Sequence, residues 1–294
     1  MTTNFYPSLE EFLAAPVEEV AKIAPATMIY SPSGTRRAAV LTGVSGQGHD
    51  YASWSRKRML ECIDLIFRHG VRHIFMPPVA PSLFNEITSE YREHLWNWLD
   101  WGLAGAEALA DYQRFGWRVR IPFGKNLPRL RAATARLEAA TPPKSAHTLW
   151  LYIVPDYNLP WQWILEAIHD SRVQTLDDAI RASYGEEIPP PTLCLASGKP
   201  TFSSSMMPPL ITRSRIDCYW SQRPGYSLDE RELRTILYDY AYLRKTWRAD
   251  KSGRAEKALM YRTAWEQGPT IGLGMRLGPF WYPAPISPPP ENNA

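Results

Sequence analysis

A glycine followed by two arginines, Gly34-Thr35-Arg36-Arg37, comes shortly after the first apolar run of the chain, residues 27–30. A glycine at the end of a strand lets backbone N–H groups approach an anion closely, and adjacent arginines can form charge-assisted bonds with phosphate oxygens. Ligands of an open parallel sheet bind beyond the carboxyl ends of its strands. The spacing therefore predicts a diphosphate site here, although a solvated surface turn can carry the same four residues.

Other kinds of chemistry lack their sequence patterns. Apart from His69 and His73, which lie on either side of the predicted helix end at Gly70, the six histidines and three cysteines show no His-x-x-x-His or Cys-x-x-Cys spacing, which argues against a zinc site. Neither a Gly-x-Ser-x-Gly elbow nor a Walker loop or dinucleotide fingerprint is present, so hydrolase, NTPase and dehydrogenase functions have no support. An odd number of scattered cysteines also argues against a disulfide scaffold and favours a reducing cytoplasm.

The elements that must position this site alternate between strand and helix, as in βαβ units with parallel pairing. A Ser-x-x-Glu capping box at Ser8 opens a first helix. The apolar patterns then predict strands at 27–30, 71–76, 117–123, 148–154, 192–196 and 210–220, and helices at 52–69, 82–115 (one, or two broken near Gly102 and Gly105), 130–140, 161–171, 176–184 and 228–247. The fold class is therefore α/β, with a mostly parallel central sheet flanked by helices. We expect a single domain over residues 1–282 and a Pro-rich tail over 283–294.

Charge and composition limit the classes of molecule that this chain is expected to bind. A net charge of +3 is too small to be a nucleic-acid footprint by itself. No apolar run approaches the roughly 18 residues of a membrane span, and the first residues lack a signal-peptide pattern, so we expect no integral membrane segment. The 12 Trp and 15 Tyr residues exceed what a packed core requires. That excess favours an aromatic-lined cavity.

The chain runs from the first strand through x-Gly-x-Arg-Arg to a helix that ends at His69-Gly70, before the next strand. This arrangement resembles the cis-prenyltransferase superfamily, whose signature is Asp-Gly-Asn-Arg-Arg. Gly34 to Arg37, with Tyr51 some seventeen residues on, is similar to a divergent branch, that of tuberculosinol synthase, also described as tuberculosinyl adenosine transferase. Residues 233–244 and the glycine and tryptophan spacing of residues 272–281 resemble the same branch. The resemblance covers residues 28–76 and 209–282.

This resemblance implies an enzyme that ionises an allylic, often bicyclic, C20 prenyl diphosphate. The cation then loses a proton or meets a nucleophile. Tryptophan and tyrosine rings suit such chemistry because their faces stabilise carbocations and offer no lone pair that would trap them.

One residue departs from the family signature. Ser33 stands where the family has aspartate, and serine lacks the negative charge used to hold Mg²⁺ or to steer a nucleophile. Asp177-Asp178 is an alternative acidic pair, but adjacent acids at the start of a predicted helix are typical of a solvated surface. We therefore assign no metal ligands and leave Mg²⁺ dependence open, with Arg36 and Arg37 as the main diphosphate partners.

The resemblance also suggests further site residues. In the superfamily a late strand ends in an Arg- and Ser-rich diphosphate segment, so Arg213 and Arg215 are candidates for a second basic group. Alternating arginines on a strand can equally be exposed edge residues. Tyr51, beside Asp50, is a candidate for steadying the diphosphate or assisting deprotonation, whereas a lone tyrosine more simply packs with a satisfied hydroxyl.

The sequence and its resemblance are compatible with three functions. The leading one is a diterpene synthase that quenches the cation by deprotonation or with water. The alternative is a prenyltransferase that joins the cation to a nitrogen or aromatic acceptor. A third is a non-catalytic relative that partners an active enzyme. We also expect a homodimer, because superfamily members commonly pair and residues 228–247 carry apolar side chains on more than one face.

Overall fold

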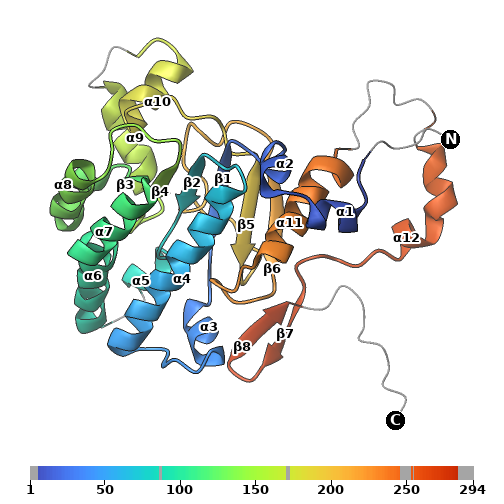
Figure 1. Ribbon diagram of the computed structural model, residues 1–294, viewed down its shortest axis with the longest axis horizontal. Coiled ribbons are helices and arrows are strands. Elements are labelled where there is room, and N and C mark those ends of the chain that lie inside the picture. The colour runs from blue at the N-terminus through green and yellow to red at the C-terminus, as the bar shows by residue number, and fades with distance from the viewer. Residues whose placement is uncertain (1–5, 86–87, 170–172, 246–252, 254, 284–294) are drawn as a thin grey trace.

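The computed structural model describes residues 6–85, 88–169, 173–245, 253 and 255–283. Its centre is a six-stranded sheet with the order β3-β4-β2-β1-β5-β6, in which every neighbouring pair is parallel. The strands are β1 (Thr27–Ser31), β2 (His73–Met76), β3 (Arg118–Arg120), β4 (Thr148–Leu151), β5 (Leu193–Ser197) and β6 (Asp217–Ser221). The predicted α/β fold with a parallel central sheet is confirmed (Figure 1).

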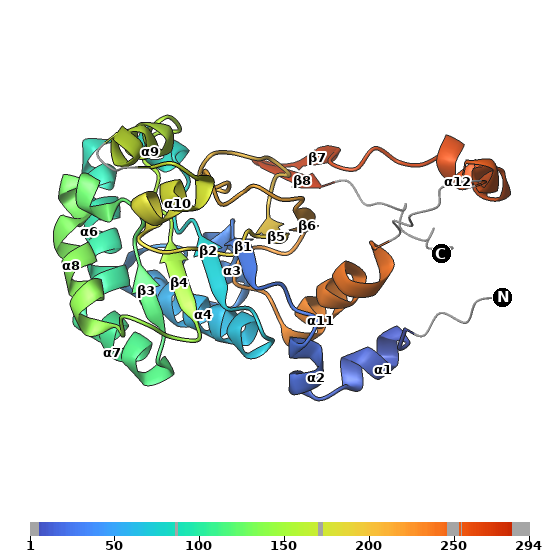
Figure 2. The same ribbon diagram turned by 90° about the horizontal axis from the view of Figure 1, so that it is seen from above.

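Helices cover both faces of this sheet. Figure 2 shows α4 (Gly48–Arg68), α7 (Ala106–Phe115) and α11 (Glu230–Tyr238) on one side, and α9 (Leu159–His169) and α10 (Leu176–Tyr184) on the other. The remaining helices of the sheet domain are α3 (Thr35–Leu41), α5 (Ser82–Asn85), α6 (Ser89–Ala104) and α8 (Arg131–Ala140). No helix in the described ranges is long and apolar enough to cross a membrane.

Strand β1 shows why the buried strands read as continuous apolar runs. Met28 and Tyr30 pack into the core beneath α4, whereas Ile29 packs into the core on the opposite face. Successive side chains of a strand point to opposite faces, so a strand covered on both faces needs apolar residues at every position.

Several predicted boundaries shift where proline or glycine intervenes. The opening helix is two helices, α1 (Leu9–Ala14) and α2 (Val17–Ala21), separated at Pro16. Residues 82–115 form three helices, and the break between the last two falls at Gly105, where a Cβ atom would lie 2.4 Å from the carbonyl oxygen of Trp101. The predicted strand 117–123 ends at Arg120, before Pro122. Helix α3 was not predicted.

The predicted strand over residues 210–220 is wrong in its first half. Only Asp217–Ser221 forms β6, and Leu210 has a positive φ of 65°, which is incompatible with a strand. Arg213 and Arg215 therefore lie in the turn that precedes β6.

The second apolar face of the predicted helix 228–247 is partly covered within the chain. Helix α11 continues into a π-helical turn, η3 (Asp239–Leu243), and residues 246–247 lie outside the described ranges. Phe12 of α1 packs on Tyr238 and Tyr242, with ring centroids 5.5 and 5.8 Å apart. Helix α1 thus covers part of the surface that suggested a dimer, whereas Leu243 is 55% exposed.

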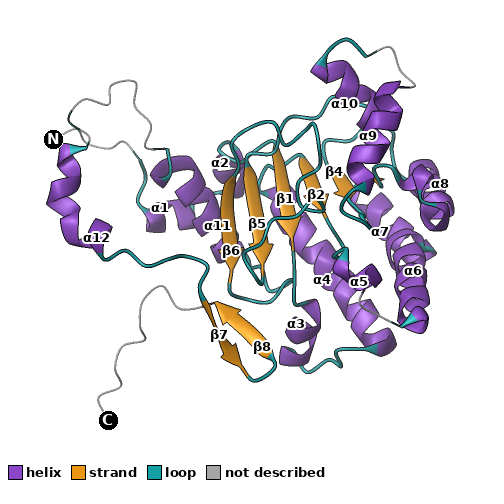
Figure 3. Cartoon of the chain, turned by 180° about the vertical axis from the view of Figure 1, so that it is seen from behind, coloured by secondary structure: helices purple, strands orange, loops and turns teal. Residues whose placement is uncertain are grey.

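The last described segment extends away from the sheet. It contains η4 (Glu256–Tyr261), α12 (Arg262–Glu266) and a hairpin of β7 (Gly274–Leu277) and β8 (Phe280–Pro283). Figure 3 shows α12 apart from the body, and the hairpin next to α3 at the end of the sheet where β5 and β6 finish. Of the predicted tail, residues 284–294 lie outside the described ranges.

Candidate active site

The Gly34–Arg37 segment begins helix α3 immediately beyond the carboxyl end of β1. Gly34 is the N-cap residue and has a φ of +78°, a left-handed conformation that glycine adopts without steric cost. The N–H groups of Arg37 and Ala38 both bond to the carbonyl of Gly34, at 2.9 and 3.2 Å. The two arginines thus lie in the first turn of a helix rather than in a loop, and both are exposed.

Ser33 is held by residues from two other strand ends. The hydroxyl of Ser197, the last residue of β5, accepts the N–H of Ser33 at 2.7 Å and donates to the Ser33 carbonyl at 3.0 Å. The N–H of Gly225, in the loop after β6, donates to the same carbonyl at 2.5 Å. Three adjacent strands, β1, β5 and β6, therefore fix the backbone just before Gly34.

Tyr51 reaches the same segment from helix α4. Its hydroxyl lies 2.6 Å from the hydroxyl of Thr35, and either group can donate the hydrogen bond. Both side chains are half-buried. The structure thus brings Ser33, Gly34, Thr35 and Tyr51 together, as the sequence suggested.

The guanidinium of Arg37 lies over Gly34. A Cβ atom at Gly34 would be 2.4 Å from Arg37 Nη2, so any other residue there would displace the arginine. On its other side, Arg37 Cζ is 5.7 Å from the centroid of the Phe280 ring in β8, within the range of a cation–π contact. The C-terminal hairpin therefore helps to orient this arginine.

Arg213 and Arg215 are not brought to this segment. Both precede β6, so they belong to the amino edge of the parallel sheet, whereas Gly34 follows β1 at the carboxyl edge. Arg213 pairs with Asp177 at 3.1 Å and Arg215 with Asp217 at 3.1 Å. Figure 1 shows α10, which carries Asp177, and α3 at opposite ends of the strands. Of the two interpretations, the structure favours surface residues.

Asp178 is a helix cap rather than a metal ligand. Its side chain and that of Thr175 form a reciprocal capping box at the start of α10. The hydroxyl of Thr175 lowers the pKa of the Asp178 carboxyl. This matches the surface interpretation of the Asp177-Asp178 pair.

The sequence reasoning missed three residues of this edge: Ser197, Lys199 and Phe280. Ser197 ends β5 and Gly198-Lys199 follows it directly, much as Ser33 and Gly34 come shortly after β1, and β5 is the neighbour of β1. Lys199 is exposed two residues beyond the strand and is the better-placed candidate for a second basic group. The signal that could have found it is a Gly-Lys pair directly after a buried apolar run.

The site does not provide the ligands of a protein-only magnesium site. Within the described ranges, no three His, Cys, Asp or Glu side chains are grouped so that they could hold a metal ion. The contacts around Gly34 involve hydroxyl, guanidinium and backbone groups. Magnesium prefers carboxylate and phosphate oxygens, so these residues suit an anion rather than a cation.

An aromatic-walled cavity is present, but at the far edge of the sheet. It has a volume of about 420 Å³, and its walls include Phe123, Trp150, Trp163 and Tyr184. Strand β3 borders it, three places from β1 in the sheet. The largest fully buried aromatic side chains, such as Trp117 and Tyr112, pack in the core. Much of the aromatic excess therefore serves packing.

Solved structures share this fold. Lavandulyl diphosphate synthase from Lavandula x intermedia, solved in complex with dimethylallyl diphosphate, aligns with a TM-score of 0.58 at 14% identity, over 78% of this chain and 98% of its own. A probable undecaprenyl diphosphate synthase from Campylobacter jejuni aligns with a TM-score of 0.55 at 13% identity, over 76% of this chain and 97% of its own. The molecule has the cis-prenyltransferase fold.

Comparison with curated proteins identifies the family of this chain. No protein-family model matches the sequence. (+)-Kolavelool synthase from Herpetosiphon aurantiacus is 45% identical over 281 residues, which is 96% of this chain and 97% of the relative. Tuberculosinyl adenosine transferase from Mycobacterium tuberculosis is 24% identical over 269 residues, 81% of this chain and 83% of the relative. The chain belongs to the family of (+)-kolavelool synthase, and the resemblance inferred from the sequence is confirmed.

Proposed function

We propose that this enzyme is a diterpene synthase that ionises a bicyclic, labdane-type C20 prenyl diphosphate at the Gly34–Arg37 site. The observation that carries the proposal is the placement of Arg37 over Gly34, at the carboxyl edge of the sheet. The 45% identity of this chain to a kolavelool synthase supports it. The name of that relative marks its product as an alcohol. We therefore favour water over proton loss as the step that ends the reaction.

The chemistry assigned to the residues is electrostatic. The allylic C–O bond breaks heterolytically, and its electron pair leaves with the diphosphate. Arg36 and Arg37 stabilise the growing negative charge on that leaving group, and Lys199 is the candidate for a third positive charge. Water then attacks the cation and gives up a proton. Tyr51, bonded to Thr35, holds the first residue of α3 in place and is the candidate acceptor or relay for that proton.

Transfer to a nitrogen or aromatic acceptor is the second candidate. The relative named as a transferase is 24% identical to this chain, well below the 45% of the synthase. Ser33 also offers no carboxylate that could serve as a base for an acceptor amine. The presence of Gly34, both arginines and Tyr51 argues against a non-catalytic partner protein.

Mg²⁺ remains a proposal for this enzyme. When bound, the ion would neutralise diphosphate charge. Because the residues around Gly34 provide no carboxylate cluster, the ion would have to enter on the substrate's own phosphate oxygens. We also propose that residues 1–282 form one catalytic domain and that the enzyme works in a reducing cytoplasm, where Cys62, Cys194 and Cys218 stay free.

We propose a homodimer on a different surface from the one that the sequence suggested. The segment over residues 259–273 exposes a run of large apolar side chains away from the sheet, and nothing in the described part of the chain buries them: Leu259, Met260, Tyr261, Trp265, Ile271 and Leu273. Contiguous exposed apolar residues mark an interaction surface. A second copy of the chain is the partner we expect.

The test of the proposed function compares two arginine variants. Wild-type enzyme, Arg37→Ala and Arg213→Ala are incubated with farnesyl, geranylgeranyl and copalyl diphosphates, and the products are identified by mass spectrometry. We expect a diterpene alcohol from the bicyclic C20 substrate. Arg37→Ala should lose about 10-fold to 100-fold in kcat/KM, since a hydrogen bond to a charged group contributes about 1.5–3 kcal/mol.

Arg213→Ala is the matched control, because it removes a guanidinium from the opposite edge of the sheet. It should retain wild-type kinetics. Equal kinetics for Arg37→Ala and the wild-type enzyme would refute the diphosphate site. A product that appears only when an acceptor amine is added would replace the synthase with the transferase.

A further inference from the structure

The loop between β6 and α11 lies directly against the proposed diphosphate site. Besides its bond to Ser33, Gly225 leaves no room for a side chain, since a Cβ atom would be 2.7 Å from the backbone nitrogen of Ser33 and 2.8 Å from the carbonyl carbon of Pro32. Any movement of Gly225 would therefore move the backbone that leads into Gly34.

The next residue, Tyr226, has an unfavourable backbone conformation. Its φ is +70°, in the left-handed region that residues other than glycine rarely adopt. Its ring is 3% exposed and lies in the core beneath α4. Burial raises the pKa of its hydroxyl, so the ring stays neutral. Such a conformation persists only where the surroundings hold it.

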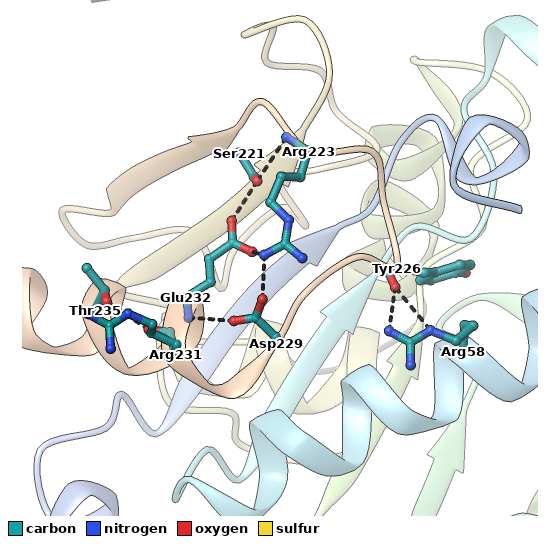
Figure 4. Close-up of polar contacts among 8 residues, drawn as sticks. All are labelled: Arg58, Ser221, Arg223, Tyr226, Asp229, Arg231, Glu232 and Thr235. Atoms are coloured by element: carbon teal, nitrogen blue, oxygen red, sulfur yellow. Dashed lines mark hydrogen bonds and ion pairs between the residues drawn. The ribbon is translucent and has the colours of Figure 1, made fainter. Parts of the chain in front are cut away.

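Arg58 of α4 holds the Tyr226 backbone. Its Nη2 and Nε atoms donate to the carbonyl oxygen of Tyr226 at 2.9 and 3.3 Å (Figure 4). The third guanidinium nitrogen, Nη1, forms an ion pair with Glu61 one turn further along the same helix. Two of the three guanidinium nitrogens of Arg58 therefore hold the loop, and the third pairs within α4.

A second set of contacts connects the two ends of the loop between β6 and α11. Arg223 bonds to Asp229 at 2.6 Å and to Glu232 at 3.0 Å, and Ser221 donates to the other oxygen of Glu232 at 2.6 Å (Figure 4). The loop ends are thus tied to α11. Between these ends, Arg58 of helix α4 bonds to the loop at the Tyr226 carbonyl.

We propose that Arg58 is a positioning residue for diphosphate binding: by gripping the Tyr226 carbonyl it holds Gly225 against Ser33 and so fixes the entry to Gly34. Arg58 acts through the backbone and does not touch the substrate. The inference rests on the proposed function of the Gly34–Arg37 site.

The experiment measures binding of inorganic diphosphate by calorimetry, together with thermal stability and kinetics, for Arg58→Ala, Arg58→Lys and two controls. Arg56→Ala is the first control, because Arg56 lies on the same helix and pairs with Glu107 and Asp111 away from the loop. Glu61→Gln is the second control, because it removes the ion pair of Arg58 and leaves the bonds to Tyr226 in place.

Arg58→Ala should weaken diphosphate binding roughly tenfold, because it removes both charge-assisted hydrogen bonds that hold the Tyr226 carbonyl. Arg58→Lys should recover part of that loss, since one ammonium can reach the carbonyl. Arg56→Ala should lower the melting temperature but keep diphosphate binding within about twofold, the pattern of a purely structural ion pair. Glu61→Gln should bind diphosphate like the wild-type enzyme.

Arg37→Ala separates this inference from the proposed function. Weak diphosphate binding in Arg37→Ala with normal binding in Arg58→Ala would overturn the role of Arg58 alone. Normal binding in both variants would overturn the site itself. If Arg58→Ala fails to fold, the lysine variant decides: affinity equal to that of the wild-type enzyme would contradict the inference.

Discussion

The hydroxyl groups of Thr35 and Tyr51 lie 2.6 Å apart and join the first turn of α3 to the first turn of α4. Residues 42–47 between the two helices are largely exposed. This hydrogen bond therefore ties the position of the Gly34–Arg37 turn to the longest helix of the fold.

Tyr51→Phe tests that link. Removing one hydroxyl should lower kcat/KM about tenfold while reducing the free energy of unfolding by only about 0.5–1.5 kcal/mol, the usual contribution of a single hydrogen bond. Thr35→Val removes the same bond from the other side. In a double-mutant cycle the two losses should not add. Full additivity in kcat/KM would show that Tyr51 acts without Thr35.

Ser33 bears on metal dependence. Because arginine and backbone donors need no metal to neutralise a leaving diphosphate, we expect EDTA to reduce the activity only partly. Ser33→Asp places a negative charge beside the diphosphate, which should slow ionisation without Mg²⁺; with Mg²⁺ present, we expect the rate to recover. Both effects can be read from one product chromatogram. Complete loss of wild-type activity in EDTA would show that a carboxylate we have not assigned binds the metal.

The exposed C-terminal segment predicts a dimer in light scattering at micromolar concentration. Trp265→Glu with Ile271→Glu should give a monomer, since charges on an apolar contact surface are costly to bury. Trp161→Glu is the control, because Trp161 is 56% exposed on α9, a helix outside this segment. A monomeric wild-type protein would remove the dimer, and an unchanged dimer in the double variant would place its interface elsewhere.

His73 predicts a loss of stability in acid. Burial, helped by the charges of Arg72 and Arg118, lowers its pKa from 6.5 to about 4. Its Nδ1 atom accepts a bond from Trp150 Nε1 at 3.3 Å, which requires the neutral ring. Between pH 6.5 and about 4 the unfolded chain therefore binds a proton that the folded chain does not, so stability falls as the pH falls, by up to about 1.4 kcal/mol per pH unit.

His73→Asn should make that dependence shallower, as measured by urea unfolding at a series of pH values. His94→Asn, at an exposed position on α6, should leave it unchanged. Burial also lowers the pKa of His69 and His147, so part of the slope should remain in either variant. A slope identical to that of the wild-type protein in His73→Asn would contradict the assignment.

The sequence by itself determined the order in which the strands of the central sheet and their main helices follow one another, and the position of Gly34 to Arg37 shortly after β1. Those features depend on local causes: apolar periodicity, the capping box at Ser8, and glycine at helix ends. Proline and glycine moved the boundaries but left the alternation, and hence the parallel sheet, intact. Helix α3 escaped prediction because its seven residues are too few to show a helical period.

Only the tertiary structure decided what surrounds that turn. Ser33 and Ser197 are 164 residues apart in sequence and meet because β5 lies beside β1, an arrangement that no local pattern specifies. Phe280 reaches Arg37 from the β7–β8 hairpin, a separate sheet near the other end of the chain. The tertiary structure also decided between the two interpretations of Arg213 and Arg215, because the strand begins only at Asp217, which places both arginines at the amino edge of the sheet. Contacts between distant segments depend on how whole elements pack, and that packing exists only once the sheet has formed.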